Sequence, residues 1–185
     1  MITSVYISNE KIQVLTGEFN AKKGSLDVKA CMYVTLPDKA IVNGVISNEL
    51  GVKESIQKLW DKYNLPKKDV SLVIDSGTIL NKKMVCPILP KSSLPTIVQD
   101  EFRDVEGFAN FLFDYTVLED GKNGEPMLFA NAVSKELVSS YIRVFKGVDI
   151  TLSRINTGIN AEIGLIKANP ATAHENQIVV SLDPT

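Results

Sequence analysis

The chain has 185 residues, of which 44% are hydrophobic and 23% are charged, and its formal net charge at pH 7 is −2. A chain of this length forms one domain, or two small ones that share a core. The charge balance gives no basic field and so excludes a general nucleic-acid-binding surface. No apolar run approaches the roughly 20 residues of a membrane-spanning helix, so direct insertion into a membrane is not expected.

The first half of the chain is dominated by strand-like patterns and one amphipathic helix. The turn-forming residues Ser8-Asn9-Glu10 predict a tight hairpin, and Asn48 is a favourable N-cap. In chain order, the pattern predicts a strand, a turn, two strands, a helix and a buried strand, over residues 2–7, 8–10, 11–19, 26–36, 48–64 and 70–75.

The second half alternates between short strands and helices. Ser92 or Ser93 is expected to begin one helix and Ser134 another. Cys31 and Cys86 lie in apolar, strand-like segments and are predicted to be reduced core residues. The pattern predicts an extended segment, a helix, two paired strands, a helix, a strand, a helix and a strand, over residues 79–90, 92–107, 111–118, 126–133, 134–147, 148–155, 158–167 and 177–182.

The last predicted strand, residues 177–182, is apolar and stands at the end of the chain. An apolar strand of this kind is typical of the middle of a sheet. We therefore expect a second half of the protein to follow it. A complete small α+β domain with a C-terminal edge strand is the alternative.

Several stretches, in this order and spacing, resemble the first lobe of an actin-like protein, and the similarity is greatest to the PilM family of type IV pilus assembly, with FtsA of cell division more distant. They are Leu36-Pro37-Asp38, Val42-Asn43-Gly44-Val45-Ile46, residues 69–74 with Ser76-Gly77-Thr78, Ile88-Leu89-Pro90-Lys91, and the strand Phe113-Asp114-Tyr115-Thr116-Val117-Leu118. The resemblance implies an α/β fold, an actin-like (ribonuclease H-like) first lobe with a small inserted α+β subdomain. Residues 1–80 and 150–185 would form the lobe, and residues 81–149 the insertion.

The resemblance also implies a nucleotide site, and the sequence departs from it. The first hairpin of actin-like nucleotide domains normally carries Asp-x-Gly before the turn and a basic residue after it, whereas this chain has Tyr6, Ser8 and Gln13 there. The second hairpin would begin with Ser181 in place of aspartate and Asp183 in place of glycine. Magnesium prefers oxygen ligands such as carboxylates. We therefore expect a degenerate site without ATP or Mg²⁺, although Ser8, Asn9 and backbone amides could still hold a phosphate.

Other catalytic or metal sites find little support in the residues. His174, the sole histidine, lies in a polar run and is expected to be exposed. One histidine and two distant cysteines make no zinc site. The stretch Asp75-Ser76-Gly77 follows a strand but lacks the G-x-S-x-G pattern of a hydrolase elbow. The sequence thus predicts no catalytic residue and no metal site.

A peptide groove is the more specific expectation. The resemblance implies binding of the short cytoplasmic peptide of an inner-membrane, PilN-like partner between the lobe and the insertion, where apolar pockets and sheet edges recognise extended peptides. The residues expected to line this surface are the aromatic and apolar side chains of the insertion, Met84, Ile88, Phe102, Phe111, Phe113 and Tyr115. Most of them are expected to be core, with one or two exposed.

The sequence therefore favours a cytoplasmic scaffold of type IV pilus assembly, held at the inner face of the cell membrane by its partner, with self-association as a further option. Two alternatives stay open. One is a functional actin-like ATPase or an FtsA-like filament former. The other is an unrelated small α+β interaction domain.

Overall fold

The structure, a computed structural model, describes residues 1–20, 25–120 and 124–168. Two short 3₁₀ turns, Lys91–Ser93 and Phe108–Asn110, accompany its regular elements. In chain order the elements are β1 (Ile2–Ile7), β2 (Lys11–Asn20), β3 (Ser25–Thr35), β4 (Ile41–Val42), β5 (Val45–Ile46), α1 (Glu49–Tyr63), β6 (Val70–Ile74), β7 (Leu80–Val85), α2 (Leu94–Glu101), β8 (Phe111–Asp120), β9 (Pro126–Ser134), α3 (Lys135–Lys146), β10 (Leu152–Thr157) and α4 (Gly158–Ala168).

The larger sheet has five strands in the order β10-β6-β1-β2-β3. Strands β1, β2 and β3 form an antiparallel meander, while β1, β6 and β10 are parallel to one another. The carboxyl ends of the three parallel strands therefore meet at one edge, which is where open α/β sheets usually bind ligands. The predicted hairpin, third strand and buried strand are all present, and the mixed sheet confirms the expected α/β class.

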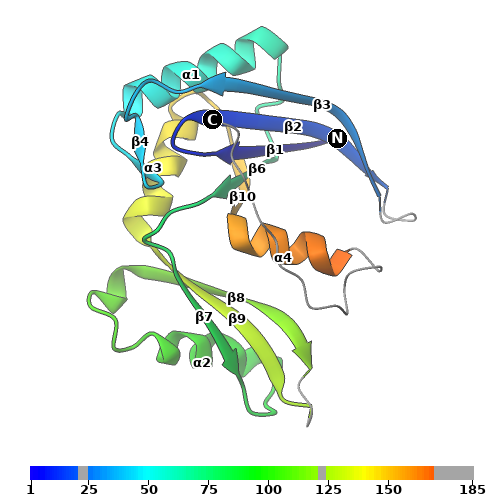
Figure 1. Cartoon of the computed structure of the whole chain (residues 1–185), viewed down its shortest axis with the longest axis vertical. Helices are drawn as coiled ribbons and strands as arrows, with labels where there is room; N and C mark the ends of the chain where they lie inside the picture. Colours follow the sequence, from blue (N-terminus) through cyan, green and yellow to red (C-terminus); the bar gives the residue numbers. More distant parts are fainter. Residues whose placement is uncertain (21–24, 121–123, 169–185) are drawn as a thin grey trace.

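Helices α1 and α3 cover one face of this sheet (Figure 1). Four residues of the apolar stripe predicted for α1 are buried, Val52, Ile56, Leu59 and Trp60, whereas the fifth, Tyr63, is 42% exposed. Trp60 meets Phe145 of α3 edge to face, with 6.3 Å between ring centroids. Two predicted N-caps, Asn48 and Ser134, make the expected side-chain hydrogen bond, whereas Ser93 stands at the N-cap of α2 without one. Asn48 accepts a hydrogen bond from Gly51 N at 3.0 Å, and Ser134 accepts one from Leu137 N at 3.3 Å. Side-chain capping of this kind satisfies amides that the first turn leaves unpaired.

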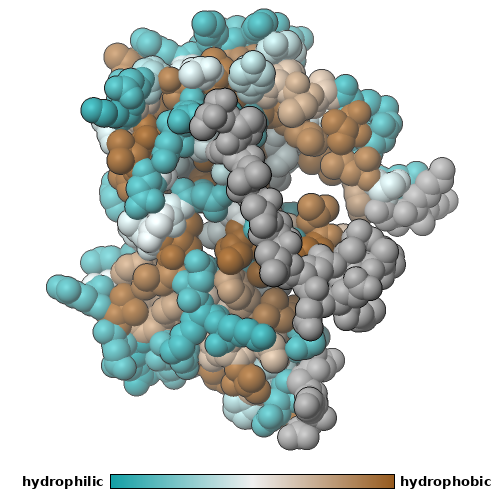
Figure 2. All heavy atoms as spheres, viewed as in Figure 1, coloured by the Kyte–Doolittle hydropathy of each residue, from teal (hydrophilic) through white to brown (hydrophobic). Residues whose placement is uncertain are grey.

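The opposite face is covered by α4 over β6 and β10, while apolar side chains of β2 and β3 stay exposed among the described residues. Figure 2 shows apolar residues gathered near the end of the sheet where the N-terminus lies. The prediction that Cys31 is a core residue is wrong, because β3 is an edge strand and Cys31 is exposed on it. The prediction is right for Cys86, which is buried.

The second unit is a three-stranded antiparallel sheet in the order β7-β9-β8, packed against α2 (Figure 1). The strand pair β8–β9 was predicted correctly. The core of the second unit is separate from that of the five-stranded sheet and is made by Cys86, Leu94, Val98, Phe102, Leu128, Ala130 and Ala132. Helix α3 packs into the core between α1 and the five-stranded sheet, through Leu137, Tyr141, Val144 and Phe145. The sequence had placed this helix with the insertion, and the domain boundaries themselves stay a prediction.

Two predicted bounds shift for identifiable reasons. Helix α2 ends at Glu101, because Phe102 and Arg103 donate to carbonyls three residues back in place of four. Strand β10 begins at Leu152, later than predicted, because the amides of Val148, Asp149 and Ile150 bond back to the last turn of α3. The predicted strand at 177–182 lies outside the described residues. No helix in the described part of the chain is long and apolar enough to span a bilayer.

Candidate functional site

The opening hairpin closes on itself. Ser8 N donates to Lys11 O at 3.0 Å, and the Ser8 hydroxyl oxygen accepts from Glu10 N at 3.3 Å and from Lys11 N at 3.2 Å. Asn9 Oδ1 accepts from Gly44 N at 3.0 Å and ties the turn to the β4–β5 loop. In a phosphate-binding turn, such amides would point at the ligand. Here the turn's own side chains use them.

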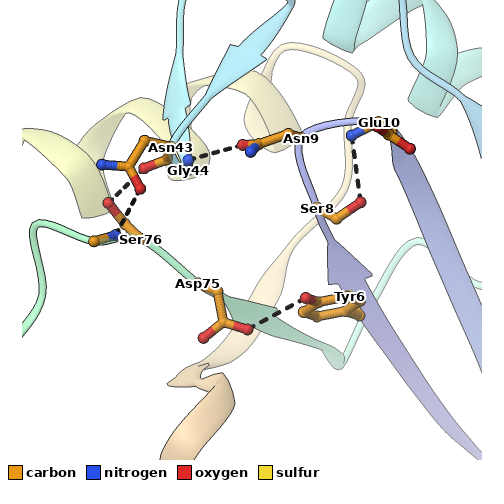
Figure 3. Close-up of a pocket in the computed structure, with 9 residues that line it drawn as sticks. Tyr6, Ser8, Asn9, Glu10, Asn43, Gly44, Asp75 and Ser76 are labelled. Carbon is orange, nitrogen blue, oxygen red and sulfur yellow. Dashed lines mark hydrogen bonds between the residues drawn. The ribbon is translucent and has the colours of Figure 1, made fainter. Parts of the chain in front are cut away.

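The hairpin borders a polar pocket of about 360 Å³ at the carboxyl ends of β1 and β6 (Figure 3). Gly44 is required there. Its φ is +74°, and a Cβ at this position would lie 2.0 Å from Asp75 O. We call this pocket the hairpin pocket, and its lining residues are Tyr6, Ser8, Asn9, Glu10, Asn43, Gly44, Asp75, Ser76 and Gly77.

Further contacts connect the loops around the hairpin pocket. Asn43 Oδ1 accepts from Gly77 N at 2.9 Å, and the Ser76 hydroxyl donates to Asn43 O at 2.7 Å. Tyr6 Oη donates to Asp75 Oδ2 at 3.3 Å, and Asp75 Oδ1 accepts from Gly158 N at 3.1 Å, at the start of α4. The pocket is thus closely bonded within itself.

Asp75 lines the hairpin pocket, although it was not assigned to a phosphate site from the sequence. It follows a buried strand, as an aspartate of such a site would, but it was considered only as part of a hydrolase elbow. With Glu10 it makes the lining acidic, and none of the described lining residues is Lys or Arg. An acidic lining repels phosphate unless a cation intervenes. The described residues contain no cluster of three or more His, Cys, Asp or Glu side chains that could hold a metal ion.

Three residues of the sequence hypothesis cannot be placed. Ser181 and Asp183 of the second predicted hairpin, and His174, lie outside the described residues. The expected loss of the second phosphate loop therefore stays a prediction.

The residues predicted for the peptide groove belong mostly to the core of the second unit. Phe102 is 5% exposed, and its ring lies 5.7 Å from that of Phe113. The ring centroid of Phe108 lies 5.0 Å from that of Phe113. Met84, Phe111, Phe113 and Tyr115 are partly buried against the same cluster. Ile88, in contrast, is 68% exposed.

A cleft does lie between the two units, and Phe113 is the predicted residue that reaches it. Its volume is about 240 Å³. Strands β8 and β10 border it, and each is an edge strand of its own sheet. We call this site the inter-unit cleft, and its lining residues are Ile74, Leu112, Phe113, Asp114, Asn131, Val133, Val138, Ile155, Asn156, Thr157 and Asn160.

Sequence reasoning missed most residues of the inter-unit cleft. Asn131 is buried in β9 and Asn160 is buried in the first turn of α4. They are far apart in the chain, and neither belongs to a local motif. The one available signal was an asparagine among small and apolar residues of a predicted strand, since a buried amide requires partners.

Comparison with known proteins gives a family and a fold. The family model described as "Type IV pilus assembly protein PilM" matches residues 4–155. No curated protein sequence matches the chain. Among solved structures, a "PilM-PilN type IV pilus biogenesis complex" is similar with a TM-score of 0.77 and 14% identity, over 90% of this chain and 50% of the other.

A second similar structure is the cytoplasmic domain of EpsL, an inner-membrane component of the type II secretion system of Vibrio cholerae. Its TM-score is 0.52 at 12% identity, over 84% of this chain and 56% of that one. The chain therefore spans about half the length of the structures it resembles. At these identities the likeness shows the fold, and it confirms the expected actin-like lobe.

Proposed function

Because the chain belongs to the PilM family of type IV pilus assembly proteins, we propose that it acts as an assembly scaffold that binds an extended peptide in the inter-unit cleft. The observation that carries this proposal is the cleft itself. It combines apolar walls with two sheet edges, which is the arrangement that recognises extended peptides through backbone pairing and side-chain pockets.

The proposed partner is the cytoplasmic peptide of an inner-membrane, PilN-like protein. The similar structure that supports this choice is described as a complex of PilM with PilN. Binding of such a peptide would hold this protein at the cytoplasmic face of the membrane. Within the group of residues first predicted for the groove, we retain Phe113 as a lining residue, and we assign Phe102 to the core beneath it.

The direct test is calorimetric titration of the partner's N-terminal cytoplasmic peptide into the wild-type protein and two matched variants. Leu112 lines the cleft and is 45% exposed, so Leu112→Arg changes the site at little cost in folding. We expect it to weaken binding at least tenfold. Ile88→Arg, at an exposed apolar residue outside the cleft, is the control and is expected to leave the affinity unchanged.

The two variants also separate two candidate surfaces. If Ile88→Arg abolishes binding and Leu112→Arg does not, the peptide binds at the surface first expected around Met84 and Ile88. Absence of any binding by the wild-type protein would overturn the proposed partner.

The second candidate function is an actin-like ATPase, and Asp75 is the observation that favours it. Its carboxylate lies in the hairpin pocket, at the edge where a nucleotide-bound cation would be held. We propose that the hairpin pocket is degenerate, because its amides are engaged and its lining is acidic. Titration of the intact protein with ATP and Mg²⁺ tests this, and micromolar affinity would favour the ATPase.

A further inference from the structure

Three asparagine side chains form a ladder that runs from the second unit to the start of α4. Asn160 Nδ2 donates to Asn131 Oδ1 at 2.6 Å, and Asn131 Nδ2 donates to Asn81 Oδ1 at 2.5 Å. Asn81 Nδ2 in turn donates to the main-chain oxygen of Ile79 at 3.4 Å. We call these three residues the amide ladder. It connects β7 and β9 of the second unit with α4, which packs on the five-stranded sheet.

The amide ladder has a direction. A main-chain carbonyl can only accept a hydrogen bond, so the bond to Ile79 O orients Asn81 with its oxygen toward Asn131. Asn81 Oδ1 then accepts from Asn131 Nδ2, which turns Asn131 Oδ1 toward Asn160. Asn160 in turn points its Nδ2 at Asn131 Oδ1. Each amide uses its nitrogen on one side and its oxygen on the other, and the ladder therefore ends in an oxygen.

That oxygen, Asn160 Oδ1, is the orphan of the ladder. Asn160 is 9% exposed, and its Oδ1 is a buried side-chain atom without a hydrogen-bond partner among the described residues. A buried acceptor without a donor is unfavourable and is rare in folded proteins. Asn160 also lines the inter-unit cleft. The orphan is therefore an atom of a residue that lines the proposed peptide site, and the atom itself is closed to solvent in this structure.

Two other polar side chains of the cleft each have one oxygen in a hydrogen bond to a neighbouring main-chain amide. Asp114 Oδ1 accepts from Tyr115 N at 2.8 Å, and Asn156 Oδ1 accepts from Thr157 N at 3.0 Å. The remaining walls are largely aliphatic and aromatic. At about 240 Å³ the cleft is also smaller than the roughly 300–1,000 Å³ of sites that enclose a whole small molecule. It suits one anchoring side chain better than a nucleotide.

We propose that the inter-unit cleft selects a peptide side chain that is uncharged and donates a hydrogen bond to Asn160 Oδ1, with the rest of that side chain against the apolar walls. This inference rests on the proposed function, since it concerns the peptide site. At Asn160 Oδ1 a cationic donor is disfavoured, because it would lose its hydration for a neutral, buried acceptor. Asp114, the carboxylate of the lining, is exposed and keeps its own hydration. Water does not reach Asn160 Oδ1 in this structure, so we expect the cleft walls to shift slightly as the side chain enters.

The test is a random heptapeptide library, displayed on phage and selected on the whole chain. Selected peptides are then measured by fluorescence polarisation on the wild type, Asn160→Leu and Asn110→Leu. We expect them to share an uncharged donor at one position and to bind Asn160→Leu at least tenfold more weakly, because the buried donor then lacks its acceptor. Asn110→Leu, at an exposed amide that does not line the cleft, is the control and should change affinity less than threefold.

A second variant protects the test from a folding defect. Asn81 is exposed and does not line the cleft, yet it fixes the direction of the amide ladder. Asn81→Ala should let the other two amides reverse, so that acceptor side chains are tolerated and the preference for donors falls at least threefold. A merely structural role for Asn81 would weaken all peptides alike.

The outcomes separate this inference from the proposed function. Selected peptides without a donor, peptides insensitive to Asn160→Leu, or no selected peptide at all would overturn the inference. If the PilN-like peptide binds but ignores Asn160→Leu, the proposed partner stands and the donor rule is wrong. If library peptides obey the donor rule and the PilN-like peptide does not bind, the donor rule stands and the partner is wrong.

Discussion

The hairpin pocket and the inter-unit cleft lie at the same edge of the five-stranded sheet, yet they treat their polar groups in opposite ways. In the hairpin pocket, side chains and amides of four loops bond to one another. In the cleft, a chain of amides ends in a buried oxygen without a partner. Internal bonding consumes the groups that a ligand would need, whereas an orphan group gains from a ligand. This difference favours the cleft as the functional site.

Helix α3 supports both sites and makes the comparison testable. Its Tyr141 is buried and donates through Oη to Gly44 O at 2.8 Å, beside the hairpin pocket. Its Val138 lines the inter-unit cleft. Changes at the hairpin pocket should therefore affect the free energy of unfolding, while changes at the cleft should affect peptide affinity.

The largest effect is expected for Gly44→Ala. The residue has a positive φ, and the new Cβ would overlap the backbone of Asp75, so the variant should lose about 3 kcal/mol of the free energy of unfolding. Urea denaturation followed by circular dichroism measures it. Gly164→Ala is the matched control, because Gly164 lies in α4 with open space around it. It should gain up to about 1 kcal/mol. Equal stability of both variants would contradict a tightly bonded hairpin pocket.

The next effect is expected for Tyr141→Phe. Without the hydroxyl, Gly44 O loses a buried donor, so the variant should lose about 1.5 kcal/mol of stability. Burial also raises the pKa of Tyr141, so this hydroxyl stays protonated and donating at neutral pH. Tyr33→Phe, at a tyrosine that is 69% exposed, should be neutral in the same urea experiment. A loss of peptide affinity without a loss of stability would show that α3 couples the two sites differently.

A smaller effect is expected for Asp75→Asn. The carboxylate accepts from Gly158 N at the start of α4, and negative charge stabilises a helix N-terminus by about 0.5 kcal/mol. The amide keeps the acceptor but removes the charge. Hydrogen exchange of the α4 amides should become slightly faster. If the wild-type protein binds ATP and Mg²⁺ and Asp75→Asn abolishes that binding, the hairpin pocket is a functional nucleotide site. The contrast drawn between the two sites would then be wrong.

The sequence predicted what depends on local pattern. The stripe of Val52, Ile56, Leu59 and Trp60 specified α1 and its buried face, and Asn48 and Ser134 specified helix starts. It failed for Cys31, because an apolar, strand-like segment does not show whether another layer covers that face of the sheet. The hairpin turn was placed correctly, but its bond to the β4–β5 loop involves Gly44, more than thirty residues away.

The inter-unit cleft could not be predicted either, because its residues are far apart in the chain and come together only in the tertiary structure. Asn81, Asn131 and Asn160 come from three elements that meet only after both sheets have formed. A single asparagine in a strand or helix usually marks a turn, a cap or a solvated face. Its role as a buried acceptor arises from the partners that it has and the one that it lacks, which are properties of the tertiary structure.

The smallest effect is expected at the outer contact between α1 and α3, where Arg143 Nε donates to Glu49 Oε1 at 2.8 Å. Hydrogen bonding to Arg143 lowers the pKa of Glu49. A carboxyl whose pKa is lower in the folded state contributes stability above its unfolded pKa, and that stability is lost as the pH falls through the folded value. Glu49→Gln should therefore be less stable than the wild type at neutral pH and equally stable near pH ~3.

Because both side chains of this pair are partly exposed, Arg143 at 51% and Glu49 at 36%, salt should reduce the difference between Glu49→Gln and the wild type. Urea denaturation at the two pH values, with and without added salt, measures it. Peptide affinity should stay unchanged throughout, since neither residue lines the cleft. If affinity instead follows the Glu49 titration, the contact between α1 and α3 reaches the peptide site through Val138, and the separation between a stability site and a binding site does not hold.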